Sequence, residues 1–393
     1  MRILMLGSGS HASTLSIRLV ALARHLGGPE RCDISMVLPS ADKYNDFRPD
    51  PAAKVPGARL IQPWQLATRS AMLNLIPYLF TSLAAILRAR ADIVYLYKPT
   101  PITILGLVPR MLFRTPVILD LDDLGSEVMK LQGQSKLQYK LVAFCEKLAL
   151  RFCSAVVVTS TYLEELVAKQ HPGKPILLLP NGVEPFDYTP SPDETPREAV
   201  YYFGAINRLD LIEDFLRALP AVVRSVPGTT VTIVGGGSAL DEAKKLVREL
   251  GVNDSVVFTG WKNDMLEVQR YASFGDLAIC CQPDTPTVRA ASNMKVFQYM
   301  AMSTVPVVSD VGDLRAYVRD GSAGAVVPPN DSEALSKSLI ALLKNPSKRA
   351  RLSRQARHLA EKEYSWESRC KVLESFIYQI LPNQKSAPER KQP

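Results

Sequence analysis

Short apolar runs alternate with longer helical segments along most of the chain. Runs such as Arg2–Leu6 and Val305–Ser309 have the length and β-branched or aliphatic composition of buried strands, and Gly, Pro or Asp punctuate the sequence between elements. Longer segments such as Lys136–Phe152 have helical patterning. Strands and helices that alternate in this way predict βαβ units on a parallel sheet.

The βαβ pattern occurs twice, on either side of a stretch with five prolines in 19 residues, PNGVEPFDYTPSPDETPRE, which is typical of a linker. The strands predicted before this linker are Arg2–Leu6, Asp33–Leu38, Ile93–Tyr97, Val117–Leu121 and Ala155–Thr159. Those predicted after it are Ala199–Phe203, Thr229–Val234, Val256–Thr259, Leu277–Cys281, Val305–Ser309 and Gly324–Val327. We therefore expect an α/β protein of two Rossmann-like, doubly wound domains. Ligands of such sheets bind outside the carboxyl ends of the strands, so we expect the domains to face each other across a cleft.

Composition supports two globular domains in a reducing compartment. The 393 residues are 47% hydrophobic, enough for each domain to bury its own core. The six cysteines form no C-x-x-C pair and lie at no metal-ligand spacing with histidine, which argues against a zinc site or disulfide framework. The first apolar run is too short for a secretory signal. We expect a cytoplasmic protein.

Positive charge is concentrated in the first half, because residues 1–190 carry 21 Lys/Arg against 15 Asp/Glu and residues 191–393 carry 26 against 24. This half also contains Ala71–Leu87, 17 uncharged residues that fall short of the roughly 20 needed to span a bilayer. A basic surface beside an apolar helix indicates peripheral contact with an anionic membrane at its inner face. A solvated basic face that only confers solubility is the alternative. No basic cluster is interleaved with aromatics, so nucleic acid is not an expected partner.

Two loops of the first domain carry candidate chemistry. Gly7 and Gly9 follow the first strand and precede a helix, where backbone N–H groups can receive a phosphate or a sugar; a tight turn without ligand is the alternative. His11 lies on the same loop. Asp120, Asp122 and Asp123 end the strand Val117–Leu121. They are either a D-x-D metal site or, as we favour, one carboxylate that orients a substrate hydroxyl and another that caps the next helix.

Two stretches of the second domain are candidates for binding a diphosphate. Gly235-Gly236-Gly237 follows a strand and opens a helix, so the three residues are either a close approach to a ligand or a plain turn. Further along, small polar residues lead into the helix Lys295–Met302, whose first N–H groups and Lys295 suit a diphosphate, while Gln298 can hold ribose hydroxyls. An ordinary helix with Phe297 and Met300 in the core is the alternative there.

These pieces, in this order, resemble the retaining glycosyltransferases of family 4, which have the GT-B architecture of two Rossmann domains. The pieces are LLLPNGVEPFDYTP, YYFGAINRLDLIEDFLRALPAV, TIVGGG, VVFTGW and SNMKVFQYMAMSTVPVVSDVGDLRAYVRDGSAGAVVPPND. The resemblance implies an acceptor-binding domain at 1–185 and a nucleotide-sugar-binding domain at 186–364. Residues 365–393 would form a helix that packs back on the first domain, and a frayed tail.

The resemblance also implies a set of site residues. The base lies near Trp261 and Lys262, the diphosphate near the start of the 295–302 helix, and the ribose at Gln298. Catalytic roles fall to Asp122, Arg208 and Lys295. The donor or acceptor contacts are Gly7, Gly9, His11, Gly204, Asn207, Gly236, Trp261, Lys262, Ser292, Asn293, Val296 and Gln298. The donor is a nucleotide-diphosphate sugar, with UDP- or GDP-sugar expected, and no metal or other cofactor is required.

The chain departs from the family pattern at several of these positions. The two family glutamates fall at Ala290 and Gln298, and the basic pair falls at Ala205 and Asp210, which leaves Arg208 as the nearby cation. Asp122 replaces the usual histidine of the first domain.

The leading hypothesis is a transferase that extends a lipid-linked or polymeric glycan. The departures support a second hypothesis, a catalytically weakened relative that binds nucleotide or glycan as a partner subunit. A nucleotide-sugar epimerase and a dinucleotide oxidoreductase are weaker alternatives, because the carboxylates and the complete glycine fingerprint that they need are missing.

Overall fold

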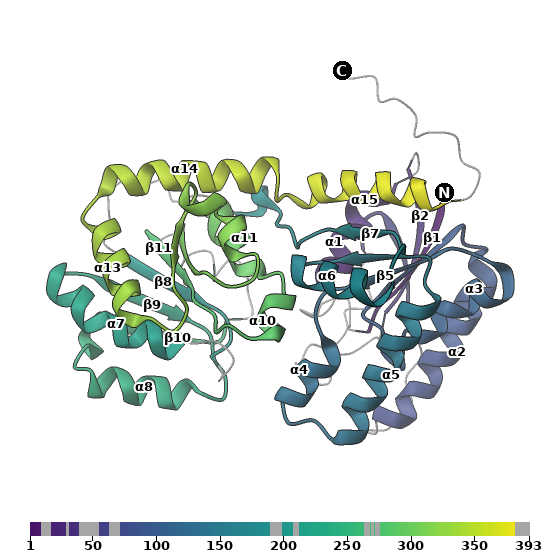
Figure 1. The fold of residues 1–393 in the computed structure, drawn as a ribbon, viewed down its shortest axis with the longest axis horizontal. Coiled ribbons are helices and arrows are strands. Elements are labelled where there is room, and N and C mark those ends of the chain that lie inside the picture. Colours follow the sequence, from purple (N-terminus) through teal and green to yellow (C-terminus); the bar gives the residue numbers. More distant parts are fainter. Residues whose placement is uncertain are drawn as a thin grey trace, which may run out of the picture. The chain divides into compact units, whose positions relative to one another are not determined.

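The computed structural model describes residues 1–8, 17–28, 31–38, 55–62, 71–188, 199–206, 212–262, 268, 271 and 276–381. The chain forms two compact units (Figure 1). Unit 1 comprises Met1–Pro180, Ala290–Ser292 and Trp366–Pro393, and unit 2 comprises Asn181–Arg289 and Asn293–Ser365. The sequence places the corresponding borders at 185/186 and 364/365.

Unit 1 is built on a parallel sheet with the order β3-β2-β1-β4-β5-β6-β7 in the described residues. Its strands are β1 (Arg2–Leu6), β2 (Asp33–Val37), β3 (Ala58–Ile61), β4 (Ile93–Tyr97), β5 (Val117–Leu121), β6 (Ala155–Val158) and β7 (Ile176–Leu178). Its helices are α1 (Ile17–Leu26), α2 (Ala71–Ala89), η2 (Ile104–Leu107), α3 (Val108–Phe113), α4 (Gly125–Leu131), α5 (Lys136–Phe152), α6 (Thr161–Gln170) and α15 (Trp366–Ile380).

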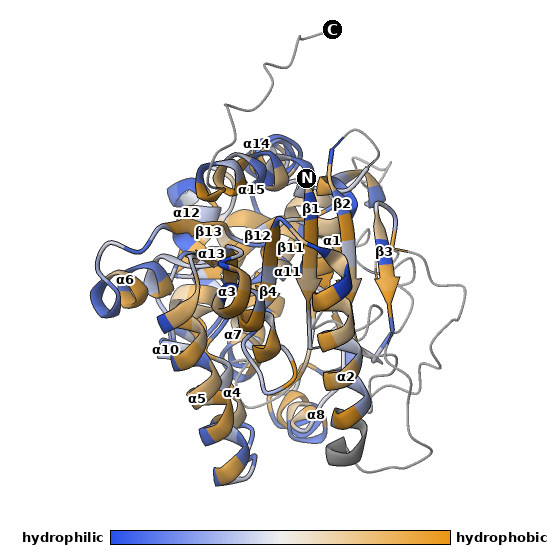
Figure 2. Ribbon diagram, turned by 90° about the vertical axis from the view of Figure 1, so that its right-hand side faces the viewer, coloured by the Kyte–Doolittle hydropathy of each residue, from blue (hydrophilic) through white to orange (hydrophobic). Residues whose placement is uncertain are grey.

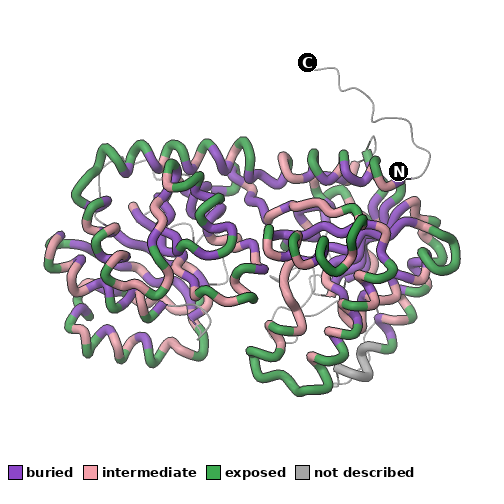
Figure 3. The backbone as a smooth tube through the Cα atoms, viewed as in Figure 1, coloured by how far each residue is buried: buried purple, intermediate pink, exposed green. Residues whose placement is uncertain are grey.

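Successive residues of each central strand enter different cores, as the alternation of side chains along a strand requires. In β1, Ile3 and Met5 pack with α1 and α15 on one face of the sheet. Leu4 and Leu6 pack with α2, η2, α5 and α6 on the other face. Figure 3 shows the result as buried strands inside helices whose outer turns are exposed. Burial on both faces explains why these strands read as continuous apolar runs.

Unit 2 has a second parallel sheet, with the order β10-β9-β8-β11-β12-β13 in the described residues. Its strands are β8 (Ala199–Phe203), β9 (Thr230–Val234), β10 (Val256–Gly260), β11 (Leu277–Cys280), β12 (Val305–Ser309) and β13 (Ala325–Val327). Its helices are η3 (Pro185–Asp187), α7 (Ile212–Ser225), α8 (Leu240–Glu249), η4 (Asn253–Ser255), α10 (Pro286–Ala290), α11 (Met294–Ala301), α12 (Leu314–Tyr317), η5 (Arg319–Gly321), α13 (Ser332–Leu343) and α14 (Pro346–Lys362).

The two faces of this sheet are covered by different helices. Helices α7, α8 and α13 share one core with the sheet. Helices α11 and α14 share the other, where Phe297 and Met300 are fully buried, as the ordinary-helix alternative states.

The two doubly wound sheets confirm the predicted fold class, and every predicted strand is present to within a residue or so at its ends. The sequence missed β3 and β7, which are short edge strands. No helix in the described part of the chain is both long and apolar enough to cross a bilayer. The uncharged segment that begins at Ala71 is instead α2, which buries Tyr78, Ala85 and Ile86 and exposes its opposite side.

Candidate functional site

The ends of β8, β9 and β10 are joined to one another through backbone hydrogen bonds. The amide of Gly204 donates to the carbonyl oxygen of Val234 at 3.0 Å, and the amide of Gly235 donates to that of Gly260 at 3.0 Å. The loops after these three strands are therefore held side by side at the carboxyl edge of the unit 2 sheet. This is the edge at which open α/β sheets bind ligands.

The three consecutive glycines after β9 have unequal structural roles. A Cβ on Gly235 would lie 1.8 Å from the carbonyl oxygen of Gly204, and a Cβ on Gly237 would lie 2.3 Å from that of Ile206. Both residues also have positive φ, +154° and +153°. Gly235 and Gly237 are thus required by the packing of the two loops, as the plain-turn alternative states. Gly236 has neither constraint.

Gly236 and Trp261 form a part of this edge that has room for a ligand. A Cβ on Gly236 would make only ordinary contact with Trp261, at 3.6 Å. The Trp261 side chain is 52% exposed, and the Nζ of the adjacent Lys262 lies 5.5 Å from the centroid of the Tyr271 ring. An exposed indole offers a flat apolar face for stacking a base.

Lys295 brings a positive charge to the end of β8. Its Nζ lies 3.4 Å from the hydroxyl oxygen of Tyr202 and 5.0 Å from the centroid of that ring. A Cβ on Gly204 would lie 2.7 Å from both Cε and Nζ of Lys295, so glycine at this position leaves the space that the lysine occupies. A predicted cation and a predicted glycine are thus brought together, in an arrangement that suits a phosphate.

The start of α11 corrects one expectation. The sequence predicts unpaired N–H groups near Ser292 and Asn293, but Asn293 is the N-cap and engages two of them. Its side chain accepts from the amide of Lys295 at 3.3 Å, and its carbonyl oxygen accepts from the amide of Val296 at 3.3 Å. The Val296 side chain is fully buried. Two N–H groups of the helix start are thus engaged from within, and Lys295 adds a positive charge beside them.

Gln298 is more deeply buried than expected for a residue that binds a ribose. It is 8% exposed, and its Nε2 donates to the hydroxyl oxygen of Tyr188 at 3.1 Å. Tyr188 is itself held from α14, because the guanidinium of Arg357 donates to its carbonyl oxygen at 3.0 Å. The amide of Gln298 therefore joins α11 to the segment that leads into the second sheet.

Several predicted residues lie elsewhere. Gly9, His11, Asn207 and Arg208 are outside the described residues. Ser292 is buried and groups with unit 1.

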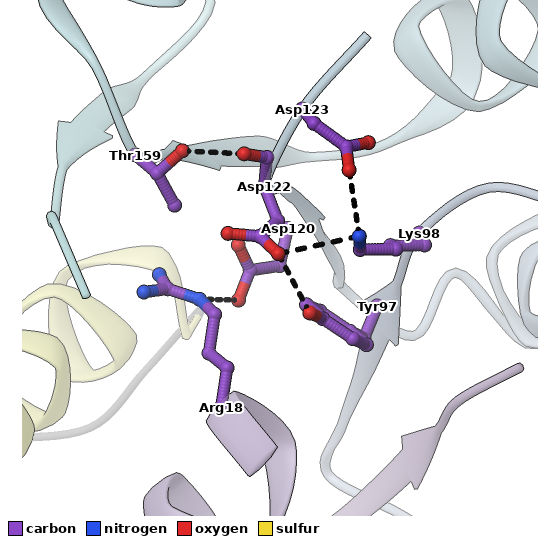
Figure 4. A network of polar contacts seen from close by, with 7 residues as sticks. All are labelled: Arg18, Tyr97, Lys98, Asp120, Asp122, Asp123 and Thr159. Carbon is purple, nitrogen blue, oxygen red and sulfur yellow. Dashed lines mark hydrogen bonds and ion pairs between the residues drawn. The ribbon is translucent and has the colours of Figure 1, made fainter. Parts of the chain in front are cut away.

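In unit 1, Asp122 belongs to a cluster at the ends of β4 and β5 (Figure 4). Its carboxylate accepts from the hydroxyl of Tyr97 at 2.9 Å and lies 3.3 Å from the Nζ of Lys98. Lys98 also donates to Asp123 at 2.8 Å, and the backbone oxygen of Asp122 accepts from the hydroxyl of Thr159 at 2.8 Å. Each residue of the cluster comes from a strand end or one of the two positions after it.

The cluster keeps its lysine charged and its tyrosine neutral. Burial alone would lower the pKa of Lys98, but the carboxylates of Asp123 and Asp122 outweigh it and raise the pKa well above its ordinary value. Burial, and then the charge of Asp122, raise the pKa of Tyr97. Asp122 remains 18% exposed at its side chain, within reach of a hydroxyl group brought to this edge.

Asp120 has a different environment from its two neighbours. It is fully buried, accepts from the Nε of Arg18 at 2.8 Å and from the hydroxyl of Tyr95 at 2.5 Å, and points to α1 (Figure 4). Burial raises the pKa of this carboxyl, while Arg18 opposes the shift. The guanidinium of Arg18 also lies 6.0 Å from the ring centroid of Trp366, so α1, β5 and α15 meet at this pair.

These contacts revise the aspartate predictions. The N-cap of α4 is Leu124 and no side chain caps it, so the proposed capping role of an aspartate is wrong. Asp120 pairs with Arg18, whereas Asp122 and Asp123 share Lys98. Among the described residues no three His, Cys, Asp or Glu side chains are grouped to hold a metal ion.

Gly7 also has a packing role. Its amide donates to the carbonyl oxygen of Val37 at 3.2 Å, and its own carbonyl oxygen accepts from the hydroxyl of Tyr78 at 2.8 Å. A Cβ would lie 2.6 Å from Leu38. The idea that its N–H receives a ligand is therefore wrong here, and the tight-turn alternative holds for Gly7.

Sequence reasoning missed Lys98, Tyr97, Tyr202 and Tyr188. Tyr97 and Lys98 could have been predicted, because they lie at the end of one predicted strand and Asp122 follows the next predicted strand along the chain. In the structure Tyr97 pairs with Asp120, which places Lys98 at the same edge of the sheet as Asp122. No sequence motif marks Tyr188 or Tyr202 as a candidate site residue.

Two family models match the chain, one to each half. The model described as "Glycosyl transferase 4-like domain" matches residues 3–182, and that described as "Glycosyl transferases group 1" matches residues 190–359.

Curated relatives match over part of their length. A GDP-mannose-dependent alpha-(1-6)-phosphatidylinositol monomannoside mannosyltransferase of Mycolicibacterium smegmatis is 30% identical over 204 residues, which are 49% of this chain and 53% of that protein. An alpha-D-kanosaminyltransferase of Streptomyces kanamyceticus is 26% identical over 43% of this chain and 42% of its own length. The match thus spans about half the length of these relatives.

Solved structures share the fold over nearly the whole chain. Sucrose-phosphate synthase from Thermosynechococcus elongatus has a TM-score of 0.75 at 20% identity, covering 97% of this chain and 99% of that one. HepE from Anabaena, in complex with UDP and glucose, has a TM-score of 0.71 at 16% identity, covering 96% and 100%. With both halves matched by glycosyltransferase models, the chain belongs to the GT-B glycosyltransferases of the family 4 type.

Proposed function

We propose that this glycosyltransferase takes a sugar from a UDP- or GDP-sugar bound by unit 2 and transfers it to a glycan or lipid-linked acceptor bound by unit 1. The observation that carries the proposal is the ammonium of Lys295 against Gly204, beside the glycine loop that ends near the exposed Trp261. The relative named as GDP-mannose-dependent and the HepE complex with UDP support a nucleotide donor.

In the proposed reaction the bond between the sugar and the diphosphate breaks as the acceptor oxygen bonds to the same carbon. Negative charge then develops on the diphosphate, where Lys295 and, from the sequence, Arg208 stabilise it without a metal. Asp122, held by Tyr97 and Lys98, orients the acceptor hydroxyl. The acceptor proton passes to the leaving diphosphate on the same face of the sugar, which retains the anomeric configuration.

We also propose that the enzyme works at the inner face of the cell membrane in polysaccharide or glycolipid assembly. A lipid-linked acceptor requires access to the membrane surface, and the excess of basic residues lies in the half of the chain that forms most of unit 1.

Donor binding is the direct test. Thermal unfolding is followed with UDP, GDP, ADP and TDP and their common sugars, with and without magnesium. Saturating ligand stabilises a fold by about 2.7 kcal/mol at a hundredfold excess over Kd. Transfer to lipid-extract and glycan acceptors is then assayed with the nucleotide that produces a shift.

The Lys295→Met variant is expected to bind that nucleotide at least tenfold more weakly, since it keeps the stem and removes the charge. Lys337→Met is the matched control, because Lys337 is exposed on α13 of the same unit and pairs with a surface glutamate, Glu333. Equal nucleotide affinity in Lys295→Met and the wild type would refute the placement of the diphosphate.

A catalytically weakened partner subunit is the second candidate, and Gln298 favours it. The residue stands where the family has a glutamate, and its amide is committed to Tyr188. Nucleotide binding without release of diphosphate, followed by turnover when a partner protein is added, would select this candidate.

A further inference from the structure

Exposed apolar side chains are concentrated on one part of unit 1. The described residues include seventeen exposed large apolar side chains, and twelve of them lie between Ile76 and Phe152. Single apolar residues scattered over a surface are ordinary and need no explanation. Groups of them mark contact with a partner or a membrane.

Eleven of the twelve lie on α2, α3 and α5, and the twelfth, Leu131, ends α4. Helices α2, α3 and α5 each contact η2, and α2 and α5 cover the same face of the sheet as η2. Figure 2 shows strongly hydrophobic residues along all three helices.

Helix α5 has a second apolar stripe beside its buried one. Val142, Cys145 and Ala149 are buried and face the core. Leu137, Leu141 and Phe144 are 78%, 46% and 60% exposed. Their i, i+4, i+7 spacing places them on one side of the helix, about a quarter turn from the buried side. The same spacing recurs on α2, where the exposed residues are Ile76, Phe80, Leu83 and Leu87.

The charges beside the α5 stripe have one sign. Lys140, Lys147 and Arg151 are exposed and, at helical spacing, lie along the edge of the stripe that is opposite to the buried side. The acidic residue of α5, Glu146, is turned to α4, where it accepts from the amide of Ser126 at 3.0 Å and its hydroxyl at 2.6 Å.

Helix α3 repeats this combination at its end. Met111, Leu112 and Phe113 are each more than 60% exposed, and exposed Arg110 and Arg114 lie on either side of them.

We infer that the α5 stripe and the end of α3 form a docking surface for an anionic lipid bilayer. Apolar side chains that enter the acyl boundary, with lysine and arginine at headgroup level, are the two components of interfacial membrane binding. A second copy of this chain is a poor occupant, since it offers the basic edge the same positive charge and not a complementary one. This deepens the proposed membrane location by naming its surface, and its test does not depend on transfer.

The test is co-sedimentation of the full chain with vesicles of equal parts phosphatidylcholine and phosphatidylglycerol, and with vesicles of phosphatidylcholine alone. The wild type is expected to bind the anionic vesicles and to be released by salt. The apolar variant Leu137→Ser/Leu141→Ser/Phe144→Ser is expected to lose at least about tenfold in binding. The basic variant Lys140→Gln/Lys147→Gln/Arg151→Gln is expected to lose about fivefold per charge, up to about a hundredfold.

The matched control is Lys348→Gln/Arg351→Gln/Arg354→Gln on α14, which removes as many exposed charges from a helix whose described residues include no exposed large apolar side chain. This variant is expected to bind vesicles like the wild type. Equal loss in the control and the basic variant, or wild-type binding by the apolar variant, would mean non-specific electrostatic adsorption and would overturn the inference. So would an absence of vesicle binding together with self-association that the apolar variant abolishes.

Nucleotide-induced thermal shifts of the same variants separate this inference from the proposed function. Wild-type shifts with lost vesicle binding support the docking surface. Absent nucleotide shifts in the wild type, with vesicle binding intact, would count against the donor site alone.

Discussion

Gly236 differs from its two neighbours in having space around it. Gly235 and Gly237 are fixed by the loop after β8, whereas Gly236 has ordinary φ and, among the described residues, only Trp261 nearby. The local sequence cannot distinguish the roles of these three consecutive glycines. The difference arises from contacts with a loop that comes about thirty residues earlier in the chain.

We predict that Gly236→Ala folds normally but weakens nucleotide binding several-fold, since its methyl group would occupy the space beside Trp261. Gly235→Ala is the contrasting variant, and it should lower the free energy of unfolding by more than about 2 kcal/mol, because its Cβ would overlap a carbonyl oxygen at strained φ. Urea titration and nucleotide titration of both variants check this. Unaltered affinity in a folded Gly236→Ala would remove Gly236 from the donor site.

The fold brings some of the candidate residues together and separates others. Lys295 and Gly204 were both named from the sequence and lie in contact. Asp120 was misread, because its partner Arg18 lies 102 residues away and only tertiary structure brings the two together. An aspartate at the end of a buried strand looks the same in sequence whether it faces solvent or a buried arginine.

Among the elements, helix α11 combines structure and proposed binding in its first turn. Its N-cap, Asn293, satisfies the amides of Lys295 and Val296. The same turn carries Lys295, the cation that we propose for the diphosphate. Two different substitutions of Asn293 therefore test helix stability and ligand binding separately.

We predict that Asn293→Ala lowers the free energy of unfolding by about 1 kcal/mol, the usual effect of losing a cap. Asn293→Asp retains an N-cap acceptor and should leave stability near that of the wild type, yet its added negative charge should weaken nucleotide binding at least tenfold. Thermal unfolding with and without nucleotide measures both effects. If Asn293→Asp binds nucleotide as tightly as the wild type, the diphosphate does not lie near this helix start.

The strands were predictable because both faces of each central strand are buried, which makes them continuous apolar runs. Strands β3 and β7 were missed for the opposite reason. They are four and three residues long, lie at the edges of the sheet and are only partly buried. Helix α4 could not be predicted from the sequence either, because it begins without a side-chain cap and buries no residue fully.

At the scale of the molecule, unit 1 is discontinuous in sequence. Its C-terminal helix α15 buries Trp366, Cys370, Leu373 and Ile377 in the core that also holds α1. Truncation of one buried tryptophan costs about 3–5 kcal/mol, so loss of the whole helix removes most of the 5–15 kcal/mol that stabilises a domain.

We therefore predict that residues 1–180 alone lack a cooperative thermal transition and bind a hydrophobic dye. Addition of a 366–381 peptide should restore the transition, and the same peptide with Trp366→Ala should restore it poorly. Circular dichroism and dye fluorescence report both states. A fragment 1–180 that unfolds cooperatively by itself would show that α15 is dispensable for unit 1.

Membership of α15 in unit 1 also sets an order of folding during synthesis. Most of unit 1 leaves the ribosome first, but its last helix leaves only after all of Asn181–Ser365 has been made. The face of the unit 1 sheet that α15 covers therefore stays uncovered until α15 has been synthesised. By that time the whole sequence of unit 2 has already been made. The half of the enzyme that is translated first is the half that is finished last, and it is the half that needs protection from aggregation in the interval.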